Sequence, residues 1–543
     1  MMTADDEFTQ AEHRLRAALR DPATTQAMLL RDILVTNQDT DFGRRHDFAS
    51  IGDVATFRER VPLASYADFA PHVARMIAGE RDVLFEGHAT FFGSTSGTTA
   101  APKLVGFNPR VRNEYVHLLG PMVSCLERDH PGASRTALLL TAQFEETTSP
   151  TGVPIGNASG FGRRSLDAHP YFRFLPEVVY ESHDTDARTY TMLLFALARP
   201  MRCFASLFPI LLINLFKRVD EAAAALADDL ERGRLEAGPP GIRAFASHCA
   251  PRLGPMPAAA TRLREIIRTH GRFVPSEYWP DVSALHVWKG GTAKHALPEL
   301  QAMFPRAEIR PMSSGSTEAA LMVPLERTWI GGVPALCSTV IEFLPADAAP
   351  DATNVVTLAD LVDGRGYRLV VTNHRGMYRY VMEDVFVIED RYHGVPILRI
   401  DHRLGIVSSL TGEKVTEEQV SHAIDHAIAA SGIAPTAFQV APEQLTAAKA
   451  SYRYAILFEG AQSSDVLRRF VRAFEDDLCA HNSQYVLNRN LGALGPAVLY
   501  RVNAGYFDAK IRTHRREIQL KRTALDTTLL VADQAFAELV TVV

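Results

Sequence analysis

The strongest constraint on the fold is a change of pattern at Ala284, after which short apolar segments alternate with helical ones. The segments ALHVWKGG, AEIRPMSSGSTEA and STVIEFLP have the pattern of strands, and Ala293–Phe304, between the first two, has the pattern of a helix. Strands that are apolar almost throughout are typical of sheets that helices bury on both faces. The sequence therefore predicts an α/β fold in which β-sheets are flanked by helices.

The character of the chain changes again near Arg403. Lys414–Ala430 has the pattern of a capped helix and Ser464–His481 that of a second helix, while YRYAILFEG and AVLYRVNAG have the pattern of strands. A chain of 543 residues is also too long for one ordinary domain. We therefore expect a large N-terminal domain over residues 1–403 and a small α+β C-terminal domain over residues 404–543.

Composition and charge argue against several classes of protein. The formal net charge is −6, whereas nucleic-acid binding requires a strongly basic face. The five cysteines are scattered and form no C-x-x-C pair, so we expect no disulfide framework or cysteine zinc site, and a reducing, cytoplasmic location fits best. The N-terminus lacks the basic start and apolar run of a signal peptide.

One apolar segment, Cys203–Phe216, raises the question of membrane insertion. It is interrupted by Pro209 and Asn214, and it is shorter than the roughly 20 apolar residues that a spanning helix needs. We therefore predict a buried helix, or one wall of an apolar pocket, and no membrane partner. Further helices are expected over Glu12–Leu34 and over Arg218–Arg232, where Gly233 ends the pattern.

A loop rich in hydroxyl groups lies between two expected strands in HATFFGSTSGTTAAPKLVGFNP. From Ser94 to Lys103 it combines serines, threonines, a glycine and a lysine, which together offer hydrogen-bond donors and a cation to a polyphosphate. It is not a Walker loop, because the Gly-Lys-Ser/Thr of that motif is missing. The alternative is a solvated polar loop with no ligand.

A second motif, Gly315-Ser316-Thr317-Glu318, follows a predicted strand. The threonine hydroxyl can bind a phosphate or carboxylate oxygen, and the glutamate can bind Mg²⁺, which prefers carboxylates together with phosphate oxygens. The alternative is an ordinary helix N-cap, in which Ser or Thr precedes Glu.

A third motif contains Tyr378 in the segment GMYRY, followed by Glu383 and Asp384. The aromatic ring can stack on adenine, and the aspartate can accept both ribose hydroxyls. The alternative is a β-hairpin with exposed charges.

The segments STSGTTAAPK, SGSTEA, GMYRYVMEDV and ILRIDHR…GEKVTEEQV, in this order, resemble the adenylate-forming superfamily. Within it, the chain most resembles the Gretchen Hagen (auxin-responsive) acyl acid amido synthetases. The lead-in VPLASYADFAPHVARMIAGE, the segment YVLNRN and the C-terminal GYFDAKIRTHRREIQLK also fit that family. The chain departs from the family pattern before Pro102-Lys103, at Glu383 and at His402.

The resemblance implies an ATP- and Mg²⁺-dependent ligase. Such an enzyme activates a small carboxylic acid as an acyl-AMP, releases pyrophosphate, and transfers the acyl group to an amine such as an amino acid. The fold implied is a large adenylate-forming N-terminal domain with a mobile C-terminal lid domain. The amine must arrive unprotonated, which requires a base or a desolvated pocket. The sequence assigns no base; Glu145 and Glu146 are candidates only as acidic residues in a loop, and the favoured alternative is that they are exposed at the surface.

The resemblance also implies roles for individual residues. Glu318 is expected to bind Mg²⁺, Arg403 to lie at the hinge, and Lys521 to enter the site during adenylation. The expected catalytic residues are Lys103, Thr317, Glu318 and Lys521. The expected nucleotide-binding residues are Thr95, Ser96, Gly97, Thr98, Thr99, Gly315, Ser316, Tyr378, Asp384 and Arg403. For Lys521 the alternative is a solvated basic face shared with neighbouring lysines and arginines.

Two other functions remain open from the sequence. The same superfamily includes enzymes that pass the acyl group to a thiol, either coenzyme A or a carrier protein. A degenerate synthetase fold could also serve as a binding scaffold, although the presence of Lys103, Glu318 and Asp384 argues against that. The identities of the acid and the amine, and the oligomeric state, are not indicated.

Overall fold

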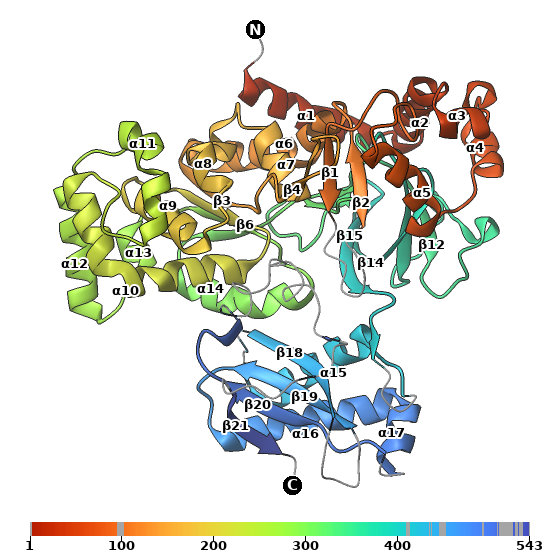
Figure 1. Ribbon diagram of the computed structural model, residues 1–543. Helices are drawn as coiled ribbons and strands as arrows, with labels where there is room; N and C mark the ends of the chain where they lie inside the picture. Colours follow the sequence, from red (N-terminus) through yellow and green to blue (C-terminus); the bar gives the residue numbers. More distant parts are fainter. Residues whose placement is uncertain are drawn as a thin grey trace. The chain divides into compact units, whose positions relative to one another are not determined.

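The computed structural model describes residues 3–94, 103–408, 413–433, 435, 437–444, 452–490, 493–507, 509, 525–526, 530 and 536–541. The chain forms two compact units (Figure 1). Unit 1 comprises Met1–Lys289 and Gln301–Ile400, and unit 2 comprises Gly290–Leu300 and Asp401–Val543. The division at Ile400 lies close to the predicted boundary at Arg403. That residues 290–300 pack with unit 2 was not predicted.

One four-stranded sheet of unit 1 is entirely parallel. Its strands, in spatial order, are β3 (Ala137–Leu140), β6 (Cys203–Ser206), β7 (Ala284–Val287) and β8 (Glu308–Pro311). Parallel neighbours need long crossover connections, and helices provide them here. These helices are α7 (Ala158–Ser165), α8 (Glu177–Tyr180), α9 (Thr185–Leu197), α10 (Pro209–Arg232), α11 (Ala246–Cys249), α12 (Pro257–His270), α13 (Pro275–Tyr278) and α14 (Leu297–Met303). Strands β6 and β7 are buried along their whole length, which confirms the predicted α/β class.

The apolar segment Cys203–Phe216 is not a single helix, so that prediction was wrong. Its first four residues form strand β6, and helix α10 begins only at Pro209. Proline suits the first turn of a helix, where its missing N–H would have had no partner. A short apolar run fits a buried strand or a buried helix equally well, so periodicity alone could not separate them. The predicted end is confirmed, because Gly233 ends α10 in the left-handed conformation with φ 66°.

A second sheet of unit 1 contains the two strands that flank the hydroxyl-rich segment in the sequence. Its strands, in spatial order, are β2 (Leu104–Phe107), β1 (Phe91–Ser94), β5 (Pro154–Gly156) and β4 (Thr147–Thr148). Strands β1 and β2 are antiparallel neighbours, with Ser94 opposite Leu104. The two predicted strands are therefore confirmed, and the hydroxyl-rich segment between Ser94 and Lys103 lies outside the described residues.

Two further sheets of unit 1 carry the second and third motifs. The larger has the order β12 (Val340–Pro345), β13 (Tyr367–Thr372), β14 (Tyr380–Tyr392), β15 (Val395–Arg403). The smaller has the order β11 (Val333–Pro334), β10 (Ala320–Val323), β9 (Ser314–Gly315). Glu318 is followed by strand β10 and not by a helix, so the helix N-cap alternative for this motif is wrong.

Helices precede the first strand of the chain. They are α1 (Ala4–Ala18), α2 (Pro22–Asn37), α3 (Asp41–Arg45), α4 (Val54–Arg60) and α5 (Tyr66–Ile77), and α6 (Val111–Asp129) follows β2. The predicted helix Glu12–Leu34 is two helices, because Asp21 caps α2 and Pro22 occupies its first turn. Short 3₁₀ turns lie at Phe48–Ser50, Ala133–Thr136, Pro170–Phe172, Pro240–Ala244, Ala250–Arg252, Gly291–Ala296, Ala352–Asn354 and Leu358–Asp360.

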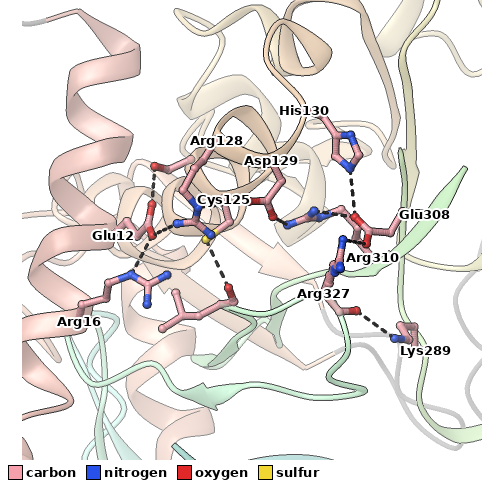
Figure 2. Close-up of polar contacts among 12 residues, drawn as sticks. Glu12, Arg16, Cys125, Arg128, Asp129, His130, Lys289, Glu308, Arg310 and Arg327 are labelled. Carbon is pink, nitrogen blue, oxygen red and sulfur yellow. Dashed lines mark hydrogen bonds and ion pairs between the residues drawn. The ribbon is translucent and has the colours of Figure 1, made fainter. Parts of the chain in front are cut away.

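A series of ion pairs joins α1 and α6 to the edge of the parallel sheet (Figure 2). On α1, the buried Glu12 accepts a 2.6 Å hydrogen bond from Arg128 of α6. The next residue, Asp129, pairs with Arg310 of β8 at 2.7 Å, and Arg310 pairs with Glu308 at 2.8 Å. These contacts fix the N-terminal helices against the frame that carries the site.

Unit 2 is a small α+β fold, as predicted. Its main sheet has the order β18 (Ala437–Gln444), β19 (Tyr452–Glu459), β20 (Val498–Val502), β21 (Phe536–Thr541), and a two-stranded ribbon pairs β16 (Val407–Ser408) with β17 (Val415–Thr416). Its helices are α15 (Glu417–Ser431), α16 (Ser464–His481) and α17 (Ser483–Asn490). Thr416 caps α15 in a capping box with Gln419, and α16 has the bounds that the sequence predicted.

In the described part of the chain, no helix is both long and apolar enough to pass through a bilayer. All five cysteines are free thiols. Burial raises the pKa of Cys125 and of Cys249 to about 11, which disfavours the reactive thiolate.

Candidate active site

Two of the motifs identified in the sequence meet at the end of strand β1. The hydroxyl of Thr317 donates a 3.3 Å hydrogen bond to the carbonyl oxygen of Ser94, the last residue of β1. This approach depends on Gly93, because a Cβ at that position would lie 2.6 Å from Cγ2 of Thr317. The predicted nucleotide-binding residues Thr95, Ser96, Gly97, Thr98 and Thr99 lie outside the described residues. Thr317 therefore lies beside the point from which that loop departs.

The other end of the loop lies beside the third motif. The Nζ atom of Lys103 lies 3.6 Å from Oε1 of Glu383 and 5.5 Å from the ring centre of Tyr66. The Tyr66 hydroxyl donates to the carbonyl oxygen of Leu104 at 2.9 Å and accepts from the N–H of the same residue at 2.7 Å. Burial raises the pKa of Tyr66, and the negative charge of Glu318 raises it further. Lys103, Tyr66 and Glu318 thus belong to one electrostatic environment.

An irregularity in strand β14 determines how the side chains of Glu383 and Asp384 are oriented. Val370 on β13 pairs with Val381, and Arg368 pairs with Val385, so β14 places three residues opposite one. Such bulges turn side chains away from the regular alternation of a strand, and they are common beside active sites. Asp384 is half-buried within this bulge, and Glu383 is exposed.

The turn that carries Thr317 and Glu318 is held by two buried side chains that the sequence did not reveal. Nη1 of Arg375 donates hydrogen bonds to the carbonyl oxygens of Ser316 and Thr317, at 3.1 and 2.7 Å. Nδ2 of Asn373 donates a 2.8 Å bond to the carbonyl oxygen of Glu318. The side chains of Arg375 and Asn373 therefore hold three consecutive carbonyl groups by hydrogen bonds, which orients the side chains of the motif.

The charge of Arg375 is balanced by Glu114 on helix α6. Nε of Arg375 lies 2.7 Å from Oε2 of Glu114, and both side chains are almost completely buried. The nearby charge of Glu114 raises the pKa of the guanidinium against the opposing effect of burial. The two residues are 261 positions apart, so no local pattern could have linked them. The only sequence signal was an ionisable residue in each of two otherwise buried segments.

The carboxylate of Glu318 is placed to receive a cation. The residue is buried, and in the described part of the chain no hydrogen bond or ion pair reaches its carboxylate. Ser316 Oγ accepts instead from the backbone N–H groups of Glu318 and Ala319, both at 3.2 Å. A buried carboxylate without a direct partner is unfavourable unless a cation compensates it. This residue therefore fits the donor set that Mg²⁺ prefers.

Tyr378 does not line a nucleotide site, and its expected role beside adenine is corrected. The side chain is completely buried, its hydroxyl donates a 2.6 Å hydrogen bond to the carbonyl oxygen of Leu84, and its ring stacks on Phe42 with centroids 4.6 Å apart. The ring and the hydroxyl group of Tyr378 therefore both have their partners inside the core of unit 1.

The same segment is a hairpin, as the alternative predicted; its charge at Glu383 is exposed, whereas its charge at Arg379 is not. Arg379 is completely buried with φ 48°, and its guanidinium pairs with Glu342 at 3.1 Å. Its Nη1 also donates to the carbonyl oxygens of Arg58 and Val61, both at 2.9 Å. The motif therefore anchors the fold behind the site.

The remaining candidates are placed as follows. Arg403 is the last residue of β15 and belongs to unit 2, and Lys521 lies outside the described residues. Glu145 is half-buried on a loop that packs against Gly156, where a Cβ would lie 3.2 Å from the Cα of Glu145. Gly156 pairs with Gly93 across β1 and β5, so Glu145 is near the site, while the exposed Glu146 accepts a hydrogen bond from Asn157.

The fold and the assembled motifs agree with one protein family over most of the chain. Models of the GH3 family match as its N-terminal domain over residues 11–309, its central domain over residues 333–403 and its C-terminal domain over residues 418–521. The chain belongs to the GH3 family, which confirms the resemblance to the Gretchen Hagen synthetases.

Individual relatives are similar over most of their length. The chain is 24% identical over 534 residues to indole-3-acetic acid-amido synthetase GH3.8 of Oryza sativa subsp. indica, covering 89% of this chain and 84% of that protein. It is 22% identical over 435 residues to 4-substituted benzoates-glutamate ligase GH3.12 of Arabidopsis thaliana, covering 77% and 75%. The solved structure of AtGH3.15 acyl acid amido synthetase in complex with 2,4-DB has the same fold, with a TM-score of 0.81 at 19% identity over 97% and 95% of the two chains.

Proposed function

We propose that this protein is an ATP-dependent acyl acid amido synthetase. It converts a small carboxylic acid to an acyl-AMP, with release of pyrophosphate, and transfers the acyl group to the amine of an amino acid. The observation that carries this proposal is that two distant motifs come together: Thr317 bonds to Ser94 at the end of β1, and both Lys103 and Glu318 interact with Tyr66. The activities named for the relatives support amide formation as the second step.

The first step brings together two anions, the carboxylate of the acid and the α-phosphate of ATP. A cation between them lowers the barrier, since the leaving pyrophosphate also carries charge. Lys103 is suited to this role because its pair with Glu383 is long, at 3.6 Å, and partly exposed. Such a pair contributes little, so Lys103 can exchange Glu383 for a phosphate oxygen at small cost.

Thr317 and Glu318 act beside Lys103 in this proposal. The hydroxyl of Thr317, whose bond to Ser94 is long at 3.3 Å, can turn to donate to an oxygen of the α-phosphate. Glu318 would hold Mg²⁺, which when bound offsets the charge of the phosphate oxygens. Arg375 and Asn373 keep the turn fixed, so these side chains need little reorganisation before the reaction.

The nucleotide is assigned to the surrounding residues. Ser96, Thr98 and Thr99 of the loop would donate to the phosphates, with Thr95 and Gly97 shaping its backbone and with Gly315 and Ser316 facing it. Asp384, half-buried in the bulge of β14, would accept the ribose hydroxyls. With Tyr378 used in the core, the adenine ring has no assigned aromatic partner.

The second step requires a different set of groups. In this mechanism Lys521 acts only in adenylation. Arg403 would lie at the hinge about which the 404–543 domain moves. Domain closure of this kind is a common gating device. Glu145, near Gly93, is the better placed of the two acidic candidates for accepting the amine proton. A reducing, cytoplasmic location is consistent with the free thiols.

A product screen tests the proposal. The protein is incubated with ATP, Mg²⁺, one acid and either one amino acid or coenzyme A, and the products are identified by mass spectrometry. Indole-3-acetate, 4-substituted benzoates and 2,4-DB are the first acids to use, and glutamate is the first amine, because these compounds appear in the names of similar proteins. An amide that forms only with ATP supports the proposal. A thioester without an amide identifies the thiol-acceptor alternative, and no product or pyrophosphate exchange with any acid identifies a scaffold.

A further inference from the structure

Three histidines surround one buried carboxylate on the helices of unit 2, in a place that the proposed reaction does not use. Nδ1 of His422 lies 2.8 Å from Oδ2 of Asp477, and Nδ1 of His481 lies 3.4 Å from the same oxygen. Nδ1 of His426 lies 3.6 Å from the other oxygen, Oδ1. The rings of His422 and His481 are in contact, with centroids 4.6 Å apart.

The spacing of these residues along their helices explains why they meet. His422 and His426 are four residues apart on α15, and Asp477 and His481 are four residues apart on α16. Side chains at this spacing lie above one another on the same face of a helix. The two helices pack side by side in unit 2 (Figure 1), so the two pairs face each other.

The burial of Asp477 distinguishes this cluster from an ordinary polar surface. Its side chain is 6% exposed, whereas the three imidazoles are 51–59% exposed. A buried carboxylate requires compensation for its charge. Among the described residues, its side-chain partners are these three imidazoles, and no lysine or arginine pairs with it. A cation bound beside Asp477 would supply that compensation.

We propose that His422, Asp477 and His481 bind a divalent transition metal ion of the Zn²⁺ class. One ligand atom from each residue lies within 4.8 Å of the others. In a tetrahedral zinc site the ligand atoms are about 3.3–3.5 Å apart, given zinc–ligand distances of about 2.0–2.2 Å. At Oδ2 the His481 separation of 3.4 Å matches this value, and the His422 separation of 2.8 Å is shorter. Nδ1 of His481 also lies 2.9 Å from the backbone carbonyl oxygen of Asp477, so metal binding requires rotation of these side chains.

The surroundings fit a metal site with one open position. Nδ1 of His426 lies 3.6 Å from the second carboxylate oxygen and 3.3 Å from the carbonyl oxygen of Ala473, so His426 stays outside the ligand set, and water would take the fourth position. Imidazole ligands select zinc, copper or nickel, whereas Mg²⁺ prefers carboxylate, carbonyl and water oxygens. This ion is therefore distinct from the Mg²⁺ that accompanies ATP. By joining α15 to α16 it would stabilise unit 2.

Direct metal binding tests the proposal without ATP or substrates, so the result does not depend on the proposed reaction. The full chain, without a histidine tag and freed of metal by a chelator, is titrated with Zn²⁺ in a calorimeter. Co²⁺ is added separately, because its visible absorption reports tetrahedral coordination by nitrogen and oxygen. We expect one site, a melting temperature that rises with Zn²⁺ and falls again with chelator, and no competition from Mg²⁺.

Variants assign the site. His422→Gln and His481→Gln, which alter exposed side chains, should each weaken Zn²⁺ binding by roughly tenfold or more and abolish the Co²⁺ spectrum. His270→Gln is the matched control, because His270 pairs with one carboxylate, Glu277, at 3.0 Å and belongs to no potential metal cluster among the described residues. Absence of saturable Zn²⁺ binding would overturn the proposal, as would equal affinity in the His422→Gln/His481→Gln double variant and the wild type.

Discussion

Thr317 and Ser94, which are 223 positions apart in the sequence, are joined by a 3.3 Å hydrogen bond from the threonine hydroxyl to the serine carbonyl oxygen. The contact places the second motif at the point where the hydroxyl-rich loop leaves strand β1. It depends on a close approach of the Thr317 side chain to strand β1, which Gly93 allows.

Gly93→Ala should therefore disturb both stability and adenylation. The added methyl group would lie 2.6 Å from Cγ2 of Thr317 and 3.0 Å from the ring of Phe107. Overpacking of this kind costs about 1–3 kcal/mol in the free energy of unfolding. Thr317→Ser in the same chain removes Cγ2 and should restore part of the loss, as measured by denaturant unfolding and pyrophosphate exchange. Gly52→Ala, with open space around the new methyl, is the control, and an effect as large there would count against the packing argument.

Lys103→Ala should slow the first half-reaction. Loss of a charge-assisted contact to a transferring phosphate costs roughly 3 kcal/mol of transition-state stabilisation, or about a hundredfold in rate. Pyrophosphate exchange measures this step directly. Lys217→Ala removes an exposed lysine from α10 and should leave the rate unchanged. Near-normal exchange in Lys103→Ala would show that the loop does not use this cation.

Glu318→Gln should raise the Mg²⁺ concentration needed for half-maximal adenylation while leaving the fold intact. The amide keeps the shape of the side chain but removes the negative charge that a cation requires. Adenylation rates over a Mg²⁺ titration, together with circular dichroism, check this. Glu326→Gln, at an exposed position beyond β10, is the control. An unfolded variant with an unaltered Mg²⁺ requirement would give Glu318 a structural role only.

Lys521→Ala should affect the two half-reactions unequally if Lys521 faces the carboxylate and α-phosphate only during adenylation. We expect a strong loss of pyrophosphate exchange and nearly unchanged amide formation from added acyl-AMP. Arg516→Ala changes a cation in the same basic segment and should affect neither step. Equal losses in both half-reactions, or equal effects of the two substitutions, would assign Lys521 to a solvated basic face.

His286 should make the protein less stable in acid. Burial lowers the pKa of His286 to about 3, and its Nδ1 lies 2.9 Å from the hydroxyl of Tyr171. Below pH 6.5 the unfolded chain binds a proton at this histidine that the folded chain does not, so stability falls as the pH falls. From pH 8 to pH 5 this one group removes about 2 kcal/mol from the free energy of unfolding.

His286→Gln should therefore lose about 2 kcal/mol less than the wild type over that pH range, as measured by denaturant unfolding at each pH. The exposed His183→Gln serves as the control and should follow the wild type. A pH dependence unaltered by His286→Gln would mean that the imidazole takes up a proton in the folded protein as readily as in the unfolded chain.

The elements with strong local signals were predictable from the sequence. Helix α16 has the predicted bounds because its apolar face repeats clearly, and α10 ends at a glycine that adopts the left-handed conformation. The prediction for Cys203–Phe216 was wrong because a short apolar run has no periodicity that distinguishes a strand from a helix.

The site was predictable only in part. Thr317 and Lys103 could be chosen from the sequence, because hydroxyl groups and a lysine in short polar segments are suited to binding phosphate. Arg375 and Glu114 could not, since their pairing exists only after distant segments pack together. Tyr378 was misjudged because sequence cannot tell an aromatic ring that stacks on a ligand from one that stacks on Phe42.

Unit 2 is discontinuous in the sequence, and this affects how the protein can be divided. The backbone passes between the units after Lys289, after Leu300 and after Ile400, the last of these within strand β15. The inserted segment carries Lys294, which pairs with Asp425 at 2.6 Å inside unit 2. A fragment that starts at Asp401 therefore lacks part of its own fold. A chimera that exchanges this unit between relatives must transplant two stretches of chain together, and a single cut at the apparent hinge would leave residues 290–300 matched to the wrong parent.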